Sequence, residues 1–277
     1  MLSRSSWRAG GWTGVFLAPA VASFAAFFLV PLARLFAVGA QGPAGIAAYL
    51  QVLGDQRYLQ SFVSTLALAA SVTLVTLCLC AVCGVYLSRA RFAAKPVLTA
   101  ILTLPLAFPG VVVGFLVIML GGRQGLVAQT GQALGGDPVV FAYSMTGLFV
   151  GYLYFSIPRS MLTVMATADK LDRDLEEAAR TLGASSFAVA RDVILPGIRP
   201  ALVASGALCF ATAMGAFGTA FTLATKINVL PMVIYSEFTL QANLAIAAVL
   251  SLWLGLLTWL VLIVARGVTG SAVAAAA

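Results

Sequence analysis

The chain has few side chains suited to catalysis or metal binding, and the most conspicuous of them are its four cysteines. Cys80 and Cys83 form a C-x-x-C pair, a spacing typical of redox and metal centres. The chain has no histidine, which excludes Ser-His-Asp and Cys-His nucleophiles, histidine-ligated metals and histidine proton relays. The apolar flanks of the cysteine pair supply neither further ligands nor access to water. We therefore interpret the cysteines as small side chains packed within helices, and we expect no catalytic residue, metal or cofactor.

A glycine-rich stretch at residues 121–137 invites comparison with a phosphate-binding loop. Such a loop ends in Gly-Lys-Ser/Thr, which holds a β-phosphate and a magnesium ion. The stretch lacks this ending, and none of the lysines follows a glycine; these are Lys95, Lys170 and Lys226. If the protein depends on ATP, another chain must hydrolyse it.

A segment between residues 159 and 199 contains a cluster of acids, namely Asp169, Asp172, Asp174, Glu176 and Glu177. Apolar residues recur there at helical spacing, and acids in the early turns suit the helix dipole; the apolar residues are Leu171, Leu175, Ala178 and Leu182. Gly183 is expected to end this helix, and Ser185 or Ser186 to cap a second one that Pro196 stops. The segment therefore predicts two short helices that project from the protein.

The composition indicates a membrane protein. Of 277 residues, 61% are apolar and 9% are charged, whereas about a quarter of an ordinary soluble domain is charged. So little polar surface cannot cover a soluble core, and the glycines follow no three-residue period, which excludes soluble, disordered and collagen-like proteins. We predict an all-α integral membrane protein.

Six charge-free runs are long enough to cross a bilayer, which takes about 20 apolar residues in a helix. They lie at or within residues 12–32, 58–88, 96–122, 138–158, 200–225 and 238–265. Arg4 and Arg8 before the first run also suit a secretory signal peptide, but such a signal has an apolar stretch of only about 7 to 15 residues. The run continues from Val15 to Leu35, so we expect an uncleaved first span.

The distribution of basic residues predicts the orientation of these spans. With the N-terminus in the cytoplasm, the inner side holds Arg4, Arg8, Arg89, Arg91, Lys95, Arg159, Lys170, Arg173, Arg180, Arg191, Arg199 and Arg266. The outer side then holds only Arg34, Arg57, Arg123 and Lys226. We predict that both termini are cytoplasmic, so the net charge of +7 reflects membrane orientation and not nucleic-acid binding.

One pattern in the acidic segment resembles a known family. Glu177-Ala178-Ala179, Gly183, Val193 and Leu195-Pro196 match EAA-x3-G-x9-I-x-LP, with valine in place of the usual isoleucine. This is similar to the EAA loop of permease subunits of bacterial ABC importers, in the right loop of a six-span protein. The resemblance implies a type I importer permease in the bacterial inner membrane, and it implies that these seven residues contact an ATPase subunit.

The resemblance extends over residues 60–266, to the polyamine, sulfate, molybdate and iron branch of the family. It rests on Met214-Gly215-Ala216-Phe217-Gly218 and on Leu104-Pro105 with Pro109-Gly110. Many relatives carry a glutamate at the position of Ala216, so any role of that acid is absent here. We expect an N-terminal segment at 1–60, a transport core at 61–266 with its coupling loop at about 159–199, and a tail at 267–277.

The family resemblance also implies partners: two ATPase subunits, a second permease subunit (a heterodimer is favoured over a homodimer) and a periplasmic binding protein. The expected substrate is a small hydrophilic solute, with a polyamine slightly ahead of ferric iron, an aminophosphonate or an oxyanion. Thr212, Thr219, Thr222 and Thr225 are candidates to line the substrate path. Small residues recur every four positions from Val203 to Thr219, which favours close helix packing.

An ATP-independent secondary carrier or channel is the alternative. Proton- or sodium-coupled carriers commonly hold carboxylates inside the membrane, and the predicted spans hold none. Such a protein would also leave the EAA pattern without a role.

Overall fold

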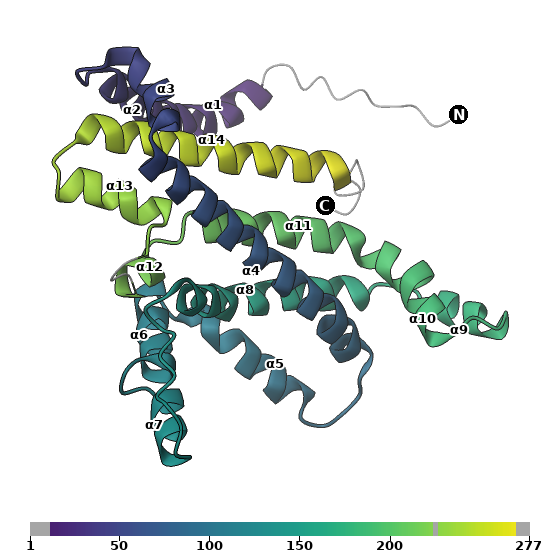
Figure 1. Ribbon diagram of the computed structural model, residues 1–277. Coiled ribbons are helices and arrows are strands. Elements are labelled where there is room, and N and C mark those ends of the chain that lie inside the picture. The colour runs from purple at the N-terminus through teal and green to yellow at the C-terminus, as the bar shows by residue number, and fades with distance from the viewer. Residues whose placement is uncertain (1–11, 224–226, 270–277) are drawn as a thin grey trace, which may run out of the picture.

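The computed structural model describes residues 12–223 and 227–269, which form helices joined by short connections (Figure 1). Arg4, Arg8, Thr225, Lys226 and most of the predicted C-terminal tail lie outside these residues. Six described segments are long and apolar enough to cross a membrane: Leu17–Ala40, Gln56–Arg89, Gly110–Ala133, Met145–Ala168, Ser186–Met214 and Leu244–Ala265. The prediction of an all-α protein with six spans is confirmed, although several boundaries differ.

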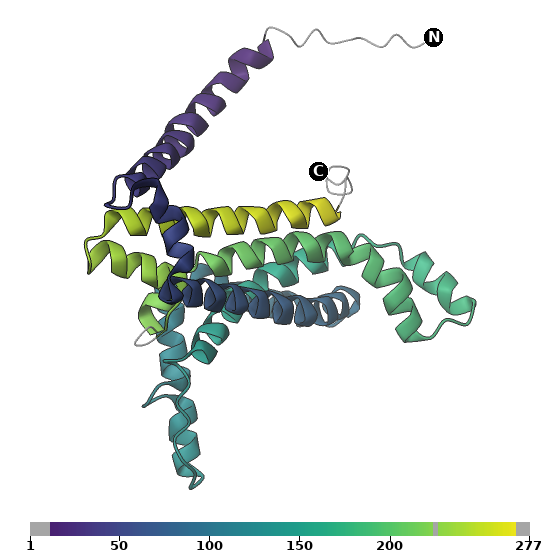
Figure 2. The same cartoon turned by 45° about the horizontal axis from the view of Figure 1, so that its top comes forward.

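Four long helices form the centre of the molecule: α4 (Gln56–Arg89), α8 (Met145–Ala168), α11 (Leu195–Met214) and α14 (Leu244–Thr269). Helix α11 packs against the other three, and α8 also packs against α4. Figures 1 and 2 show these helices running side by side. Their buried apolar side chains form most of the core.

Glycines allow the central helices to approach closely. A Cβ atom on Gly84 of α4 would lie 2.9 Å from Cγ1 of Val164 on α8, and one on Gly206 of α11 would lie 2.8 Å from Cδ1 of Leu77. Both distances are shorter than van der Waals contact, so a larger residue would push the helices apart.

The first span is one continuous helix made of α1 (Trp12–Phe24), η1 (Ala25–Leu29) and α2 (Val30–Ala40). Its second half packs against α14, whereas α1 extends away from the bundle (Figure 2). The span is longer than predicted and includes Arg34. The η1 segment is a wide π turn directly before Val30-Pro31, where the proline ring would otherwise clash with a carbonyl of the preceding turn. Two short helices follow, η2 (Gly45–Ala47) and α3 (Ala48–Gly54).

The prediction of a third span within residues 96–122 is wrong as a single helix. The chain instead forms α5 (Lys95–Thr103), η3 (Leu104–Ala107), α6 (Gly110–Gly121) and α7 (Leu126–Ala133). Pro105 and Pro109 cannot donate backbone hydrogen bonds, so the helix breaks between α5 and α6. The two helices meet at an angle (Figure 1), and the third candidate span begins only at Gly110.

The fourth and fifth spans are shifted from their predicted positions. Helix α8 starts at Met145 and continues through Pro158 and Arg159 to Ala168. After α9 (Arg173–Thr181), the chain forms α10 (Ser186–Val189) and η4 (Ala190–Ile194), which run without a break into α11. The non-helical part of the predicted loop is therefore much shorter than residues 159–199. Beyond Met214 lie α12 (Gly218–Leu223) and α13 (Leu230–Thr239).

The four-residue repeat of small side chains does not form the packed face of α11. Val203, Ala207 and Ala211 are half-buried and Gly215 is exposed, whereas the fully buried positions include Ala201, Ser205, Gly206, Cys209 and Ala213. A helix turns every 3.6 residues, so a repeat of four drifts around its surface. Most of this repeat therefore lies beside, and not on, the face that packs within the chain, whereas its last member, Thr219, is buried.

One end of the molecule gathers the segments predicted to be cytoplasmic. The α4–α5 connection, the α9–α10 pair and the C-terminal end of α14 all lie at the right in Figure 1. The α13–α14 turn and α3 lie at the opposite end. The predicted inner and outer loops therefore fall on opposite sides of the bundle.

Candidate functional site

Helix α9 carries the EAA residues, and local signals fix both of its ends. The Asp172 carboxylate accepts a hydrogen bond from the Asp174 amide at 3.0 Å, which caps the N-terminus. At the other end Gly183 has φ +88°, a left-handed conformation that favours glycine. Its amide donates to the Arg180 carbonyl at 2.9 Å, and the Ala184 amide donates to the Ala179 carbonyl at 3.0 Å. These two bonds form a Schellman motif, which confirms the predicted helix end.

Helix α10 begins as predicted but does not end at Pro196. The Ser185 hydroxyl accepts a hydrogen bond from the Ala188 amide at 3.2 Å and caps the helix. The expectation that Pro196 stops this helix is wrong, because the π turn η4 displaces the carbonyl that the proline ring would contact. Pro196 instead lies in the first turn of α11, and Ser186–Met214 is one continuous helix.

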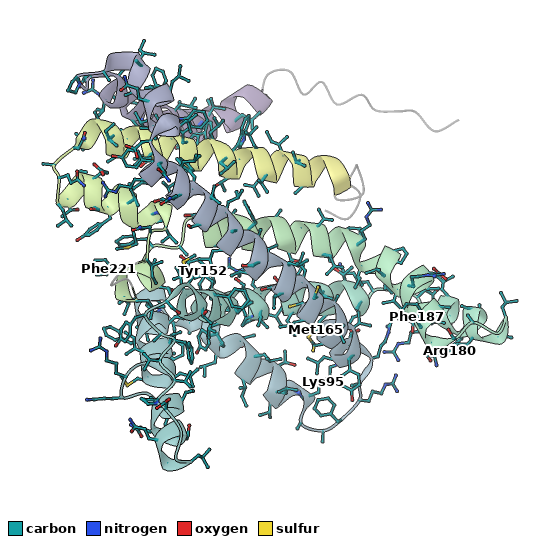
Figure 3. All side chains as sticks on the ribbon, in the orientation of Figure 1. Lys95, Tyr152, Met165, Arg180, Phe187 and Phe221 are labelled. Atoms are coloured by element: carbon teal, nitrogen blue, oxygen red, sulfur yellow. The ribbon has the colours of Figure 1, made fainter. Side chains whose placement is uncertain are left out.

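An exposed apolar surface covers the α9–α10 pair. Leu175, Ala178 and Leu182 share one face of α9 and are exposed, as is Phe187 of α10; Figure 3 shows Phe187 and Arg180 on the projecting helix pair. Leu182 is 89% exposed. Exposed apolar clusters outside a membrane are typical of protein interfaces. We call these four residues the docking face.

The structure brings most of the predicted EAA residues to the surface of this projection. Glu177, Ala178, Gly183, Leu195 and Pro196 are exposed, and Ala179 and Val193 are half-buried. The outward position of Leu175 and Leu182 was not predicted, because helical periodicity identifies an apolar face but not what covers it.

Polar contacts join the end of α4 to α9 and to Asp169, the residue that follows α8. The Arg89 guanidinium forms an ion pair with Glu176 of α9, and the Ser88 hydroxyl donates to Asp169 Oδ1 at 2.6 Å. Glu176 is therefore held within the chain. Its partner lies 87 residues away, a separation that no local sequence signal reveals.

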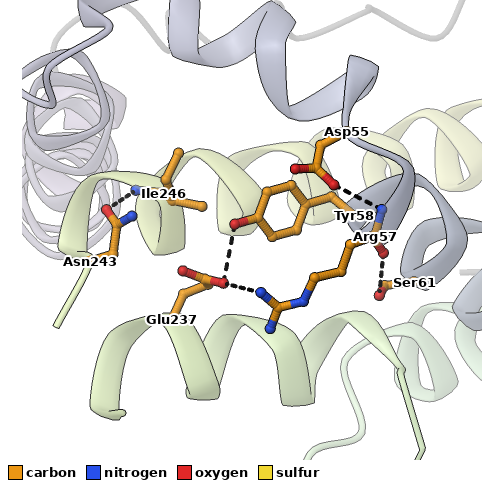
Figure 4. Close-up of polar contacts among 7 residues, drawn as sticks. All are labelled: Asp55, Arg57, Tyr58, Ser61, Glu237, Asn243 and Ile246. Atoms are coloured by element: carbon orange, nitrogen blue, oxygen red, sulfur yellow. Dashed lines mark hydrogen bonds and ion pairs between the residues drawn. The ribbon is translucent and has the colours of Figure 1, made fainter. Parts of the chain in front are cut away.

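A second buried polar cluster lies at the opposite end of the bundle (Figure 4). Oε1 of Glu237 on α13 accepts hydrogen bonds from Arg57 Nη1 at 3.2 Å and from the Tyr58 hydroxyl at 3.1 Å, both on α4. The Glu237 side chain is 1% exposed. This cluster therefore ties α13 to the start of α4.

The threonines proposed for the substrate path donate their hydroxyl protons to backbone carbonyls. Thr219 is buried and bonds to Gly110 at 2.9 Å. Thr222 bonds to Gly218 at 3.0 Å and Val111 at 3.3 Å, and Thr212 bonds to Leu208 at 2.6 Å. Thr219 and Thr222 thus join α12 to α6, at the break between α5 and α6.

The segment between α11 and α12 is fixed by Tyr152 of α8. The Tyr152 hydroxyl donates to the Ala216 carbonyl at 2.6 Å, and the ring is fully buried. Phe217, Phe221 and Tyr235 form an aromatic cluster next to this segment, with centroids 5.3 to 5.4 Å apart. Two helix breaks, after α5 and after α11, are therefore packed together.

The cysteines form no cluster with other metal-ligating residues in the part of the chain that the structure describes. Cys80 is buried and its thiol lies 3.5 Å from the Ile157 carbonyl, whereas Cys83 is exposed. The thiol contact falls beside Pro158, where α8 lacks one of its own amide donors.

Comparisons with known proteins agree with this geometry. Residues 81–270 match the family described as binding-protein-dependent transport system inner membrane component. The chain is 29% identical to PhnU of Salmonella typhimurium, named for 2-aminoethylphosphonate transport, over 77% of this chain and 76% of PhnU. It is 31% identical to a permease of Haloferax volcanii named for molybdenum transport, over 81% of this chain and 80% of that protein.

Two further similarities are to a permease and to a solved structure. The sulfate transport permease CysT of Salmonella typhimurium is 35% identical over 59% of this chain and 61% of CysT. A chain of a bacterial alginate ABC transporter, crystallised with an alginate-bound periplasmic protein, superposes with a TM-score of 0.78 at 16% identity. That match covers 94% of this chain and 95% of the other. The chain therefore belongs to the inner membrane permease family of binding-protein-dependent ABC importers, as a transport subunit without a catalytic domain.

Proposed function

We propose that this permease passes a small oxyanion or an aminophosphonate from a periplasmic binding protein to the cytoplasm. The proposal is carried by the similarity, over about three quarters of the chain, to permeases named for 2-aminoethylphosphonate and molybdenum. The family resemblance slightly favours a polyamine as the substrate. The substrates for which these relatives are named instead support an oxyanion or an aminophosphonate.

The substrate is testable through the periplasmic binding protein that works with this permease. Its affinities for 2-aminoethylphosphonate, sulfate, molybdate and spermidine would be measured by calorimetry. Vesicles containing the assembled importer would then be tested for ATP-dependent uptake of the ligand that binds most tightly. We expect an anion to bind best; tighter binding of spermidine or of a sugar would refute this substrate class.

We further propose that two ATPase subunits power the importer and that one of them binds the α9–α10 pair of this chain. Glu177, Ala178, Ala179 and Gly183 would form the contact, and Val193, Leu195 and Pro196 would join it to the fifth span. The exposure of the docking face supports this role, because four apolar side chains lie uncovered at the cytoplasmic end. ATP-independent uptake by this chain alone would instead support a secondary carrier or channel.

A second, different permease subunit completes the proposed membrane unit. Helix α1 extends from the bundle, and many apolar side chains of α6 are exposed, so both can pack on a partner or on lipid. Two differently tagged copies of this chain would be expressed together with a candidate partner permease from the same organism. Recovery of both tags in one complex would contradict the heterodimer.

A further inference from the structure

An open cavity of about 620 Å³ lies at the cytoplasmic end of the molecule, where α4 ends and α5 begins. Its wall is formed by the α4–α5 connection and the first turns of α5, between Ala90 and Thr103. Figure 3 labels Lys95 at this end of the molecule. The family resemblance assigns no role to this cavity.

Most of the wall is apolar in its chemistry. Phe92, Pro96 and Ala100 line it directly. Thr99 and Thr103 also line it, but their hydroxyl protons are donated to the Lys95 carbonyl at 2.9 Å and the Ala100 carbonyl at 2.7 Å. Without free hydroxyl donors, this part of the wall suits hydrocarbon better than a hydrated ion.

Two cations, Arg91 and Lys95, line this cavity, and no carboxylate lines it. Arg91 is exposed and has no hydrogen-bond or ion-pair partner among the described residues. Lys95 Nζ donates one hydrogen bond to the Ser88 carbonyl at 3.1 Å, which leaves two of its three protons for a ligand. Of the acids that contact the end of α4, Glu176 pairs with Arg89 and Asp169 accepts a hydrogen bond from Ser88.

The cavity lies at the predicted membrane boundary. Helix α4 crosses the membrane and ends at Arg89, and α5 returns from Lys95 toward the bundle. Val97 and Ile101 of α5 and Leu104 of η3 are also exposed apolar residues near this cavity, on another face of the helix than the lining residues. Charge at the boundary and an apolar wall beside it match the two ends of a phospholipid.

We propose that this cavity binds one anionic phospholipid of the inner leaflet. The phosphate contacts Arg91 and Lys95, and the acyl chains lie against Phe92, Pro96 and Ala100. A free anion would gain nothing from the apolar wall, and a zwitterionic lipid would gain less from the two cations. The site depends only on membrane insertion and not on which solute the permease carries.

The test uses the whole importer, with its ATPase and partner permease, in detergent and then in nanodiscs. Native mass spectrometry would measure retention of added phosphatidylglycerol and phosphatidylcholine. The double variant Arg91→Gln/Lys95→Gln should weaken phosphatidylglycerol binding by about thirtyfold, because each basic residue near the membrane contributes roughly a factor of five. Phosphatidylcholine retention should fall much less.

A second variant and a matched control distinguish the contribution of the two cations from that of the apolar wall. Ala100→Trp keeps both cations but fills the apolar wall, and it should also reduce phosphatidylglycerol retention. Arg159→Gln/Arg199→Gln removes two exposed cations that are also predicted to be on the cytoplasmic side, outside the cavity, and should leave retention unchanged. Purification of each complex with its subunits intact confirms folding.

Three outcomes would overturn the proposal. The first is unchanged phosphatidylglycerol binding in the Arg91→Gln/Lys95→Gln variant. The second is competition by glycerol phosphate as strong as that by the lipid, which would indicate a site for a free anion. The third is loss of the partner permease from this variant, which would indicate that a subunit and not a lipid covers the cavity.

Discussion

Arg57 Nη1 lies 3.2 Å from Oε1 of the buried Glu237, although 180 residues separate them in the chain. The two partners differ in environment: the Arg57 side chain is 51% exposed, whereas that of Glu237 is 1% exposed. Water can therefore solvate the cation if its partner is lost, but it cannot reach the carboxylate. The pair should respond unequally to removal of either member.

We expect Arg57→Gln to lower the free energy of unfolding by about 2 to 3 kcal/mol, because it leaves a buried carboxylate without its cation. Glu237→Gln should cost about 1 kcal/mol, since the amide still accepts a hydrogen bond from Tyr58 and the guanidinium stays hydrated. Thermal unfolding in detergent would compare the variants with Arg123→Gln, an exposed control in another outer loop. Equal effects of the two changes would show that the carboxylate is not isolated from water.

Gly183→Ala should disturb ATPase binding through backbone strain alone. A Cβ at Gly183 meets no atom within 4 Å, but its φ of +88° makes alanine cost about 1 to 2 kcal/mol. Gly135 is a matched control, since its φ is +76° and a Cβ there also meets nothing within 4 Å, yet it lies in an outer loop. Co-purification of the ATPase should fall for Gly183→Ala and not for Gly135→Ala. Equal retention in both variants would argue against a rigid α9–α10 contact.

Leu182→Ser should weaken ATPase binding by about tenfold to a hundredfold, because a buried leucine contributes about 1.5 to 3 kcal/mol at an interface. Leu134→Ser is the control, since Leu134 is 88% exposed against 89% for Leu182 but lies on the outer side. Binding of the purified ATPase to permease in nanodiscs would be measured by surface plasmon resonance. If both changes act alike, the docking face has no special role.

Arg89→Glu and Glu176→Arg should each reduce transport per ATP hydrolysed, because each places two like charges where the ion pair forms. The double variant restores the opposite charges and should recover part of the loss. Uptake and ATP hydrolysis would be measured together in vesicles. Additive losses in the double variant would indicate that the pair does not connect α4 with α9.

The Thr219→Val substitution tests whether Thr219 stabilises the fold or contacts the substrate. The change keeps the shape of the side chain but removes the hydrogen bond to the Gly110 carbonyl, at a cost of about 1 to 3 kcal/mol. Because the hydroxyl proton is already used, we expect lower stability with an unchanged KM for uptake. A large change in KM at unchanged stability would instead place Thr219 in the path.

Local signals predicted the elements whose ends are set by neighbouring residues. The helix over Arg173–Thr181, its end at Gly183 and the serine cap at Ser185 all follow from side chains within a few positions. The six spans follow from hydropathy, because the bilayer imposes one minimum length on all of them.

Features that depend on proline or on distant contacts could not be predicted in this way. Pro105 and Pro109 break the third span, whereas Pro158 and Pro196 lie within long helices. Whether a proline breaks a helix depends on the backbone around it. A π turn accommodates Pro196, and no pattern in the local sequence predicts that turn. The Arg57–Glu237 and Arg89–Glu176 pairs join segments that are adjacent only after folding.

Helix α11 gives the fifth span the geometry of a lever. Its 20 residues make a rod about 30 Å long, joined at an angle to α10 with the proposed ATPase contact at one end (Figure 2), and with the Tyr152–Ala216 hydrogen bond just beyond the other. A tilt of about 8° around one end displaces the other by about 4 Å, which is longer than a hydrogen bond. A small rotation imposed by the ATPase would therefore move the far end of the helix by several ångströms. That movement is large enough to replace the contacts between the helix breaks after α5 and after α11 with other contacts.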